Sequence, residues 1–531
     1  MSVVRERWVL HGAAAVVVVA VLAPLAAPGY VLAYDMVFVP RQPLRWDLIA
    51  PADALPRAVP LDALVALVTQ AVPGWLVQRL ALAAILYAAA VGAGKLVPAE
   101  RTLTRVVAAI GYAWTPFLAE RLLIGHWGLL LCYAALPWLI RAALARRTDT
   151  LVLAAAAAAL TPTGGVIAFA TACALPVPKR AKLAVGALNA PWLMAAVVTT
   201  ASGRSDPAGV AAFAARGENW SGPLGALLGT GGIWNAQTTP ASRASALVPL
   251  ATAVVLALAV AGYPVLRRRW PAGFATRLAV VALVAFVLAL AGTRPAAPLL
   301  EWLVAQVPGT GLLRDGQKLL IPYAMLLALC AALGAERLNR RAVLVGAALL
   351  PLVVLPDLAY GGAGRLRPVE YPRDWAIVAD RIGEAPGVVL SLPFHTYRAY
   401  PWNGRRTALD PAPRYLPAPV LVDDTLVVGG TAVAGESGPA GEARQRLAAG
   451  APVPGVRWVL VQRDAGGAVP DGALTGLHLV YAGPSLTLYE NPDPGPPALP
   501  SPPWPLPLAG HALFGLLAAA AAVSMIRACH T

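Results

Sequence analysis

Long apolar runs alternate with short polar segments along most of the chain. Most of these runs approach the ~20 apolar residues that an α-helix needs to cross a bilayer. They lie at 8–27, 75–96, 103–117, 127–144, 151–160, 166–175, 183–200, 244–266, 274–291, 319–333, 342–358 and 506–525. The pattern predicts a polytopic membrane protein of about twelve transmembrane helices.

The polar segments differ in charge, and this difference predicts an orientation. Every second segment is short and rich in Arg and Lys, as at 146–147, 267–269 and 340–341. Short basic loops stay on the cytoplasmic side of a membrane. We therefore expect both termini in the cytoplasm and the long segments outside, including the first outer loop at 28–73.

Residues 359–505 have a different pattern. Trp375, Val378 and Ile382 recur at helical spacing within 373–385. Short runs rich in Val, Leu and Tyr, bounded by Gly and Pro, predict β-strands. These runs lie at 387–392, 457–462, 477–482 and 485–490. The region therefore reads as a small extracytoplasmic α/β domain, joined by the proline-rich stretch 492–505 to the last apolar run.

The expected fold class is mainly α, with this α/β domain added. The expected organisation is a membrane domain over 1–358, the outer α/β domain over 359–505, and a final transmembrane helix with a cytoplasmic tail over 506–531.

Composition supports the membrane class and narrows the function. The 531 residues are 58% hydrophobic and only 13% charged, whereas soluble domains carry about a quarter charged residues. The formal charge of +15 falls mostly in the short basic segments. It is therefore mainly an orientation signal, and no nucleic-acid partner is predicted.

The sequence offers little standard catalytic chemistry. It lacks a Walker A loop, an HExxH pair and a Gly-x-Ser-x-Gly elbow. Its four cysteines lie in or beside apolar runs without the spacing of a metal site. We predict neither a metal nor a cofactor.

The first candidate site residue is Asp35, about eight residues beyond the first apolar run. A carboxylate at this depth is either part of a solvated loop or part of a wet site at the membrane boundary. Asp47 and Asp53 lie farther along the same loop and closer to prolines, which favours solvated turns for them.

Further candidates lie at two other outer boundaries. Glu120, Arg121 and His126 fall between the third and fourth apolar runs, and Arg314 and Lys318 precede the run at 319–333. Arginine grips phosphate with two parallel hydrogen bonds and lysine adds a point charge. These residues would suit a substrate with a lipid-linked phosphate. The alternative is interfacial anchoring, which for His126 is the simpler interpretation.

The segment 395–415 is rich in Tyr, Trp and Arg. Aromatic and basic side chains of this kind would fit either a glycan platform or a loop that packs on the membrane domain. The sequence leaves both readings open.

The architecture resembles the GT-C class of membrane glycosyltransferases over nearly the whole chain. The likeness rests on the acidic first outer loop, the many apolar runs, the turn at 161–165 and the outer domain. The stretches YAWTPFLAERLLIGHW and LLRDGQKLLIPYAML are also similar to multi-spanning actinobacterial proteins, some of them related to cell-envelope mannosyl- and arabinofuranosyltransferases.

This resemblance implies a sugar transferase of the cell envelope. The donor would be a polyprenyl-phosphate sugar, the acceptor an envelope glycan or lipid, and Asp35 the catalytic base. The paired acids of metal-dependent members are missing, because Tyr34-Asp35-Met36 holds one carboxylate. A non-catalytic envelope-assembly factor therefore stays open. A lipid or glycan transporter ranks second to the transferase, since polar residues within the apolar runs are scarce.

Overall fold

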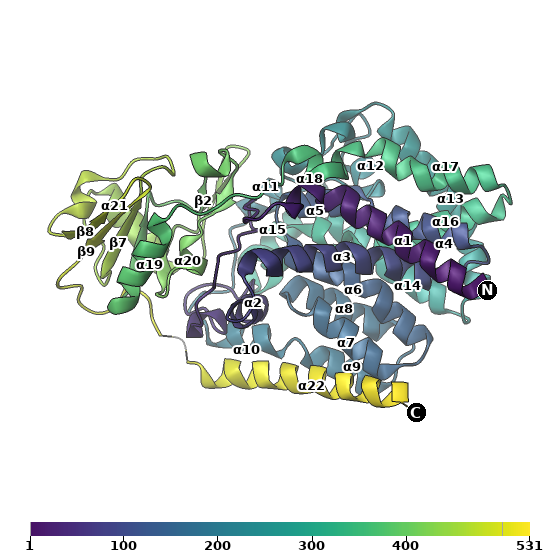
Figure 1. The fold of residues 1–531 in the computed structure, drawn as a ribbon, viewed down its shortest axis with the longest axis horizontal. Helices are drawn as coiled ribbons and strands as arrows, with labels where there is room; N and C mark the ends of the chain where they lie inside the picture. The colour runs from purple at the N-terminus through teal and green to yellow at the C-terminus, as the bar shows by residue number, and fades with distance from the viewer. Residues whose placement is uncertain (1, 502, 531) are drawn as a thin grey trace.

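The computed structural model describes residues 2–501 and 503–530. Met1, where the first predicted domain begins, and Thr531, where the last one ends, lie outside the described residues. Figure 1 shows a helical body with an α/β domain at one end. Both chain ends lie at the opposite end of the body, and the last helix returns along its side.

Helices form at every apolar run that the sequence pattern marks. The longer helices of the body are α1 (Ser2–Leu22), α3 (Gly74–Leu96), α4 (Thr102–Ala113), α6 (Trp127–Leu144), α7 (Thr148–Ala158), α8 (Pro162–Ala174), α13 (Val248–Arg269), α14 (Phe274–Leu290), α15 (Ala297–Gln306), α16 (Ile321–Arg337), α17 (Arg341–Val354) and α22 (Pro505–His530). The shorter ones are α2 (Leu61–Thr69), α5 (Pro116–Leu123), α9 (Lys179–Ala187), α10 (Ala190–Val198), α11 (Ala208–Ala212), α12 (Gly222–Leu228) and the left-handed turn α18 (Ala359–Gly364).

The described residues contain six helices that are long and apolar enough to cross a membrane, or up to eight if each of two bent pairs forms one span. This makes the chain a multi-pass membrane protein, but it does not confirm twelve spans. Some predicted spans form helices too short to cross a membrane. Helix α4, with 12 residues, is about 18 Å long, well short of a ~30 Å hydrocarbon core.

Glycines allow the close contact between α13 and α16. A Cβ atom at Gly334 would lie 1.9 Å from the carbonyl oxygen of Leu258, and one at Gly262 would lie 1.9 Å from that of Cys330. No larger residue fits at either position, so the two backbones approach directly. Small residues at a helix contact are the usual means of tight packing inside membranes.

The α/β domain contains one five-stranded sheet in the order β4-β1-β7-β9-β8. Its strands are β1 (Val389–Leu392), β4 (Val420–Leu421), β7 (Trp458–Gln462), β8 (His478–Ala482) and β9 (Leu486–Glu490). Strand β1 pairs in parallel with β4 and β7, and β9 pairs antiparallel with β7 and β8. The four strands predicted from the sequence are β1, β7, β8 and β9.

Two helices cover the opposite faces of this sheet. Helix α19 (Asp374–Glu384) buries Trp375 in one apolar cluster, and α21 (Gly438–Ala448) buries Leu447 in another. Smaller elements lie beside the sheet. They are the paired strands β2 (Tyr397–Arg398) and β3 (Ala408–Leu409), the hairpin β5 (Leu426–Val428) and β6 (Thr431–Val433), and helix α20 (Ala412–Tyr415).

The first outer loop joins the α/β domain to the helical body. The backbone of Tyr34 donates to the carbonyl of Thr407 at 2.7 Å and accepts from the amide of Leu409 at 2.8 Å. Arg45 donates to the carbonyls of Leu416 and Ala418. The two parts of the chain are therefore held together by backbone as well as side-chain hydrogen bonds.

Candidate functional site

The loop that carries Asp35 is fixed against the end of α5. The amide of Asp35 donates to the carbonyl of Ile124 at 3.1 Å. The next residue is Gly125, with a φ of +83°, and a Cβ atom there would lie 2.2 Å from the amide nitrogen of Met36. Glycine is thus required for this approach. Tyr34 also has a positive φ of 44°, so the turn at Asp35 is tightly constrained.

The Asp35 carboxylate accepts hydrogen bonds on both oxygens. Its Oδ2 lies 3.0 Å from His126 Nε2, and its Oδ1 accepts from the Tyr397 hydroxyl at 2.6 Å. The side chain is nevertheless 40% exposed, which leaves room for another ligand. Burial raises the pKa of Asp35, but the hydrogen bonds from His126 and Tyr397 and the charge of Lys318 outweigh it and bring the pKa to about 2. The group is therefore an ionised carboxylate at neutral pH.

The neighbours of His126 define its protonation. Arg121 Nη1 lies 3.1 Å from His126 Nδ1, and a guanidinium can only donate. Nδ1 is therefore the acceptor, and Nε2 carries the proton that is donated to Asp35. Burial and the positive charge of Lys318 lower the pKa of His126, which agrees with a neutral ring.

Asp315 completes the group on the far side of Arg121. Arg121, only 1% exposed, donates from Nη1 and Nη2 to the two oxygens of Asp315, each at 3.2 Å. Lys318 Nζ lies 3.2 Å from Asp315 Oδ2. The two cations hold the pKa of Asp315 well below its usual range despite its burial. We call Asp35, His126, Arg121, Asp315, Lys318 and Tyr397 the Asp35 group.

Glu120 lies outside this group, in the interior of the protein. It is buried, and its Oε2 accepts from the amide of Ile233 at 3.2 Å. Burial and the adjacent carboxylate of Glu218 raise the pKa of Glu120 well above its usual range, which favours the neutral acid. Glu218 accepts from Arg243 Nε at 2.7 Å. Glu120, Glu218 and Arg243 form a second cluster, the Glu120 group.

Arg314 is also separated from Lys318, with which the sequence grouped it. Its guanidinium lies 5.0 Å from the Phe213 ring centre, and Nη1 lies 3.8 Å from Glu436 Oε1 in the α/β domain. Of the expected site residues, the structure brings together Asp35, Arg121, His126 and Lys318.

The sequence interpretation missed Asp315 and Tyr397 as members of the site. Asp315 lies in the Leu-Leu-Arg-Asp-Gly-Gln-Lys stretch, between the two cations that drew attention there. Tyr397 belongs to the aromatic segment 395–415, 362 positions away from Asp35. The segment packs on the helical body at this point, and only the α/β fold brings its tyrosine to the first loop.

The arrangement suits proton and phosphate chemistry at a membrane surface. Asp35 offers an accessible carboxylate to a hydroxyl. Lys318 is 29% exposed and uses one polar partner in the group, so donors remain for an anion. In the part of the chain that the structure describes, no three His, Cys, Asp or Glu side chains gather as metal ligands would.

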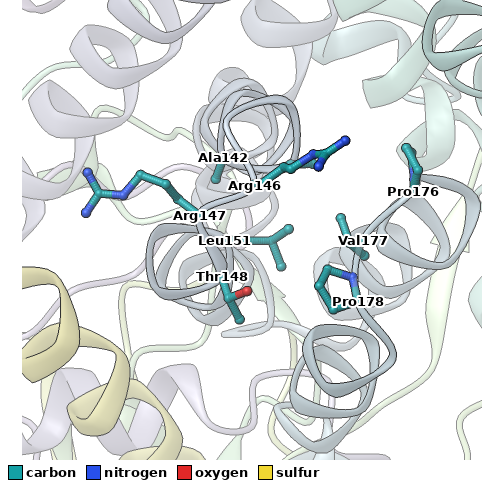
Figure 2. Close-up of a pocket in the computed structure, with 9 residues that line it drawn as sticks. Ala142, Arg146, Arg147, Thr148, Leu151, Pro176, Val177 and Pro178 are labelled. Atoms are coloured by element: carbon teal, nitrogen blue, oxygen red, sulfur yellow. The ribbon is translucent and has the colours of Figure 1, made fainter. Parts of the chain in front are cut away.

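One cavity in the helical body lies away from this group. It measures about 220 Å³ and is lined by Ala142, Ala143, Arg146, Arg147, Thr148, Leu151, Pro176, Val177 and Pro178. Figure 2 shows Arg146 extending toward Pro176, whereas Arg147 points away. His126 precedes α6 and Arg146 follows it, so about 27 Å of helix separates this cavity from Asp35.

The chain has the fold of solved structures of an arabinofuranosyltransferase, which agrees with the resemblance seen in the sequence. The arabinofuranosyltransferase AftD from Mycobacteria matches 92% of this chain with a TM-score of 0.55 and 18% identity. Two structures of its R1389S variant match 91% of the chain, with TM-scores of 0.55 and 0.53. The match spans about 40% of the AftD chain. No family model and no curated protein matches the sequence.

Proposed function

We propose that this protein is a GT-C-type membrane glycosyltransferase. It transfers a sugar from a polyprenyl-phosphate donor to an envelope glycan or lipid acceptor at the outer membrane face. The observation that carries the proposal is the ionised, partly exposed Asp35 carboxylate, held between His126 and Tyr397 on a fold shared with an arabinofuranosyltransferase. Lys318 lies in the same group.

In the proposed reaction the acceptor hydroxyl oxygen attacks the anomeric carbon of the donor sugar. The bond from that carbon to the phosphate oxygen breaks, and polyprenyl phosphate leaves with the bonding electrons. The hydroxyl proton passes to Asp35. Because the pKa of Asp35 is only about 2, the carboxylate first orients the hydroxyl and accepts the proton late, when the oxygen has become acidic.

Lys318 is the proposed partner of the donor phosphate. A positive charge next to the leaving phosphate stabilises the negative charge that develops on it. Arg121 and Asp315 are buried and bonded to each other, so they position Lys318 and His126 without contacting substrate. Arg314 faces Glu436, and we assign it to holding the α/β domain in place rather than to the donor.

The proposed orientation puts residues 359–505 outside the cell and both termini inside. Thr431 is exposed on strand β6, and Thr431→Cys in a cysteine-free background gives an accessible probe. A membrane-impermeant thiol reagent should label it in intact cells. Labelling only after the cells are opened would show that the proposed orientation is wrong.

Asp35→Asn tests the catalytic role. The substitution keeps the size and hydrogen bonding of the side chain but removes its basic oxygen. Sugar transfer in reconstituted membranes should fall about 10²–10⁴-fold, with expression unchanged. Asp47→Asn is the matched control, because Asp47 pairs with Arg45 in the same loop and has no contact in the Asp35 group.

A non-catalytic assembly factor is the competing function. The single carboxylate of Tyr34-Asp35-Met36 is the observation that favours it. Wild-type transfer by Asp35→Asn, or no transfer by the wild-type protein with any polyprenyl-phosphate sugar, would support this alternative.

A further inference from the structure

A second cavity lies among the helices of the membrane domain. It has a volume of about 110 Å³ and is bounded by α4, α13, α16 and α17. Its walls are apolar, formed by residues such as Val255, Leu327 and Val354. Both α13 and α16 belong to candidate membrane spans, so the cavity lies at membrane depth.

One end of this cavity is polar. Arg243 lines it and is only 2% exposed, yet its Nη2 has no hydrogen-bond partner among the described residues. Thr230 and Thr252 line the cavity beside it. A Cβ atom at Gly229 would lie 3.2 Å from Arg243 Nη2 and 2.9 Å from Thr252 Oγ1, so glycine keeps the space between these two groups open.

The polar end offers one free hydrogen-bond donor to an anionic oxygen. Arg243 Nε is bonded to Glu218, which balances one unit of charge. Burial and the carboxylate of Glu218 shift the neighbouring Glu120 toward its neutral form, so it adds little repulsion. The free Nη2 group can therefore donate to an anionic oxygen, and a buried donor without a partner is costly to leave unpaired.

The cavity is distinct from the Asp35 group. Thr115 and Pro116, at the start of α5, line the cavity, whereas Ile124, just after its end, bonds the amide of Asp35. Helix α5 has eight residues and is about 12 Å long. None of the six residues of the Asp35 group lines the cavity, so a phosphate at Arg243 would contact a different set of side chains from the leaving group of the proposed transfer.

We propose that this cavity binds one hydrocarbon chain of an anionic phospholipid, whose phosphate accepts a hydrogen bond from Arg243 Nη2. An apolar cavity at membrane depth gains dispersion contacts when a lipid chain enters it, and the unpaired guanidinium nitrogen gains a charge-assisted hydrogen bond. The bound lipid would be a resident component of the fold, separate from donor and acceptor.

Gly111→Leu tests occupancy of the cavity. A Cβ atom at Gly111, in α4, meets only Ala328 Cβ, at 4.0 Å, so a leucine there extends into the cavity. Leucine also favours helix more than glycine does, so folding should be preserved. Native mass spectrometry in detergent with added phosphatidylglycerol should show one bound lipid fewer per protein than wild type.

Gly346→Leu is the matched control for Gly111→Leu. Gly346 lies on the neighbouring helix α17, has open space around it, and does not line the cavity. It should retain the wild-type number of phosphatidylglycerol molecules. Equal numbers in Gly111→Leu and wild type would overturn the proposal.

Arg243→Lys tests the polar end. Lysine keeps the charge opposite Glu218 but lacks the second guanidinium nitrogen. The preference for phosphatidylglycerol over phosphatidylcholine of the same chains should fall about tenfold. An unchanged preference would overturn the role of Arg243, and wild-type binding of polyprenyl phosphate in place of phosphatidylglycerol would overturn the choice of lipid.

Discussion

The short helix α5 supplies neighbouring residues to two different buried clusters. Arg121 enters the Asp35 group, where both carboxylates contact a nitrogen group. Asp315 contacts Arg121 and Lys318, and Asp35 contacts His126. Glu120 enters the Glu120 group, where burial and the neighbouring carboxylate of Glu218 raise its pKa and Arg243 pairs with Glu218. The first cluster has a partly exposed carboxylate, and the second is closed to water.

This difference separates the functions of the two clusters. A water-borne hydroxyl can reach Asp35, which lies under the α/β domain at the end of the helical body. The Glu120 group instead borders an apolar cavity among membrane helices. One side of α5 thus suits chemistry at the membrane surface, and the other suits contact with a lipid.

Replacing Arg121 or Glu120 by glutamine should lower the stability of the protein by very different amounts. Arg121→Gln leaves Asp315 buried with Lys318 alone, and breaking a buried ion pair in this way typically costs about 3–5 kcal/mol. Glu120→Gln should cost less than about 1 kcal/mol, because an amide replaces a protonated carboxyl of the same shape. Unfolding of both purified variants in detergent, followed by circular dichroism, checks the contrast. Equal losses would mean that Glu120 is ionised.

Tyr397→Phe sharpens the comparison on the Asp35 side. The change removes the 2.6 Å hydrogen bond that stabilises the ionised form of Asp35, so the pKa of Asp35 should rise from about 2 toward its usual value. In the proposed mechanism the ionised Asp35 is the active form, so activity would then be lost at a higher pH on the acid side. The transfer rate at neutral pH should change much less, since Asp35 stays ionised there.

The pH–rate profile of Tyr397→Phe should be compared with that of Tyr34→Phe. The Tyr34 hydroxyl donates to Gln237 and does not contact Asp35, so its removal should leave the acid limb in place. If both variants shifted the limb equally, the effect would come from the loop as a whole rather than from the Tyr397 hydrogen bond.

The smallest expected effect separates the two cations that precede α16. Lys318→Ala should weaken donor binding about fivefold to tenfold, while Asp315 keeps its bidentate partner Arg121. Arg314→Ala should leave donor affinity near wild type, because Arg314 faces Glu436 and Phe213. Titration with a polyprenyl-phosphate analogue distinguishes them. A larger loss of donor affinity for Arg314→Ala than for Lys318→Ala would indicate that Arg314 contacts the donor.

Much of the architecture is readable from local pattern. Apolar runs of sufficient length and the basic clusters between them predict helices at membrane depth, and the helices form where the runs lie. Alternating Val, Leu and Tyr between Gly and Pro likewise predicted four strands of the five-stranded sheet. The fifth, β4, has only two residues, too few to give a periodic signal.

The sequence by itself determined that this is a membrane protein with an added α/β domain, and that Asp35 lies about eight residues beyond the first apolar run. Only the tertiary structure decided the partners of Asp35. His126 and Tyr397 are 91 and 362 positions away from it, and no local periodicity links residues at such separations. Tertiary structure also decided which cluster Glu120 and Arg121 each join. They are adjacent in sequence, but successive side chains on a helix point about 100° apart, so packing around α5 sends them to different clusters.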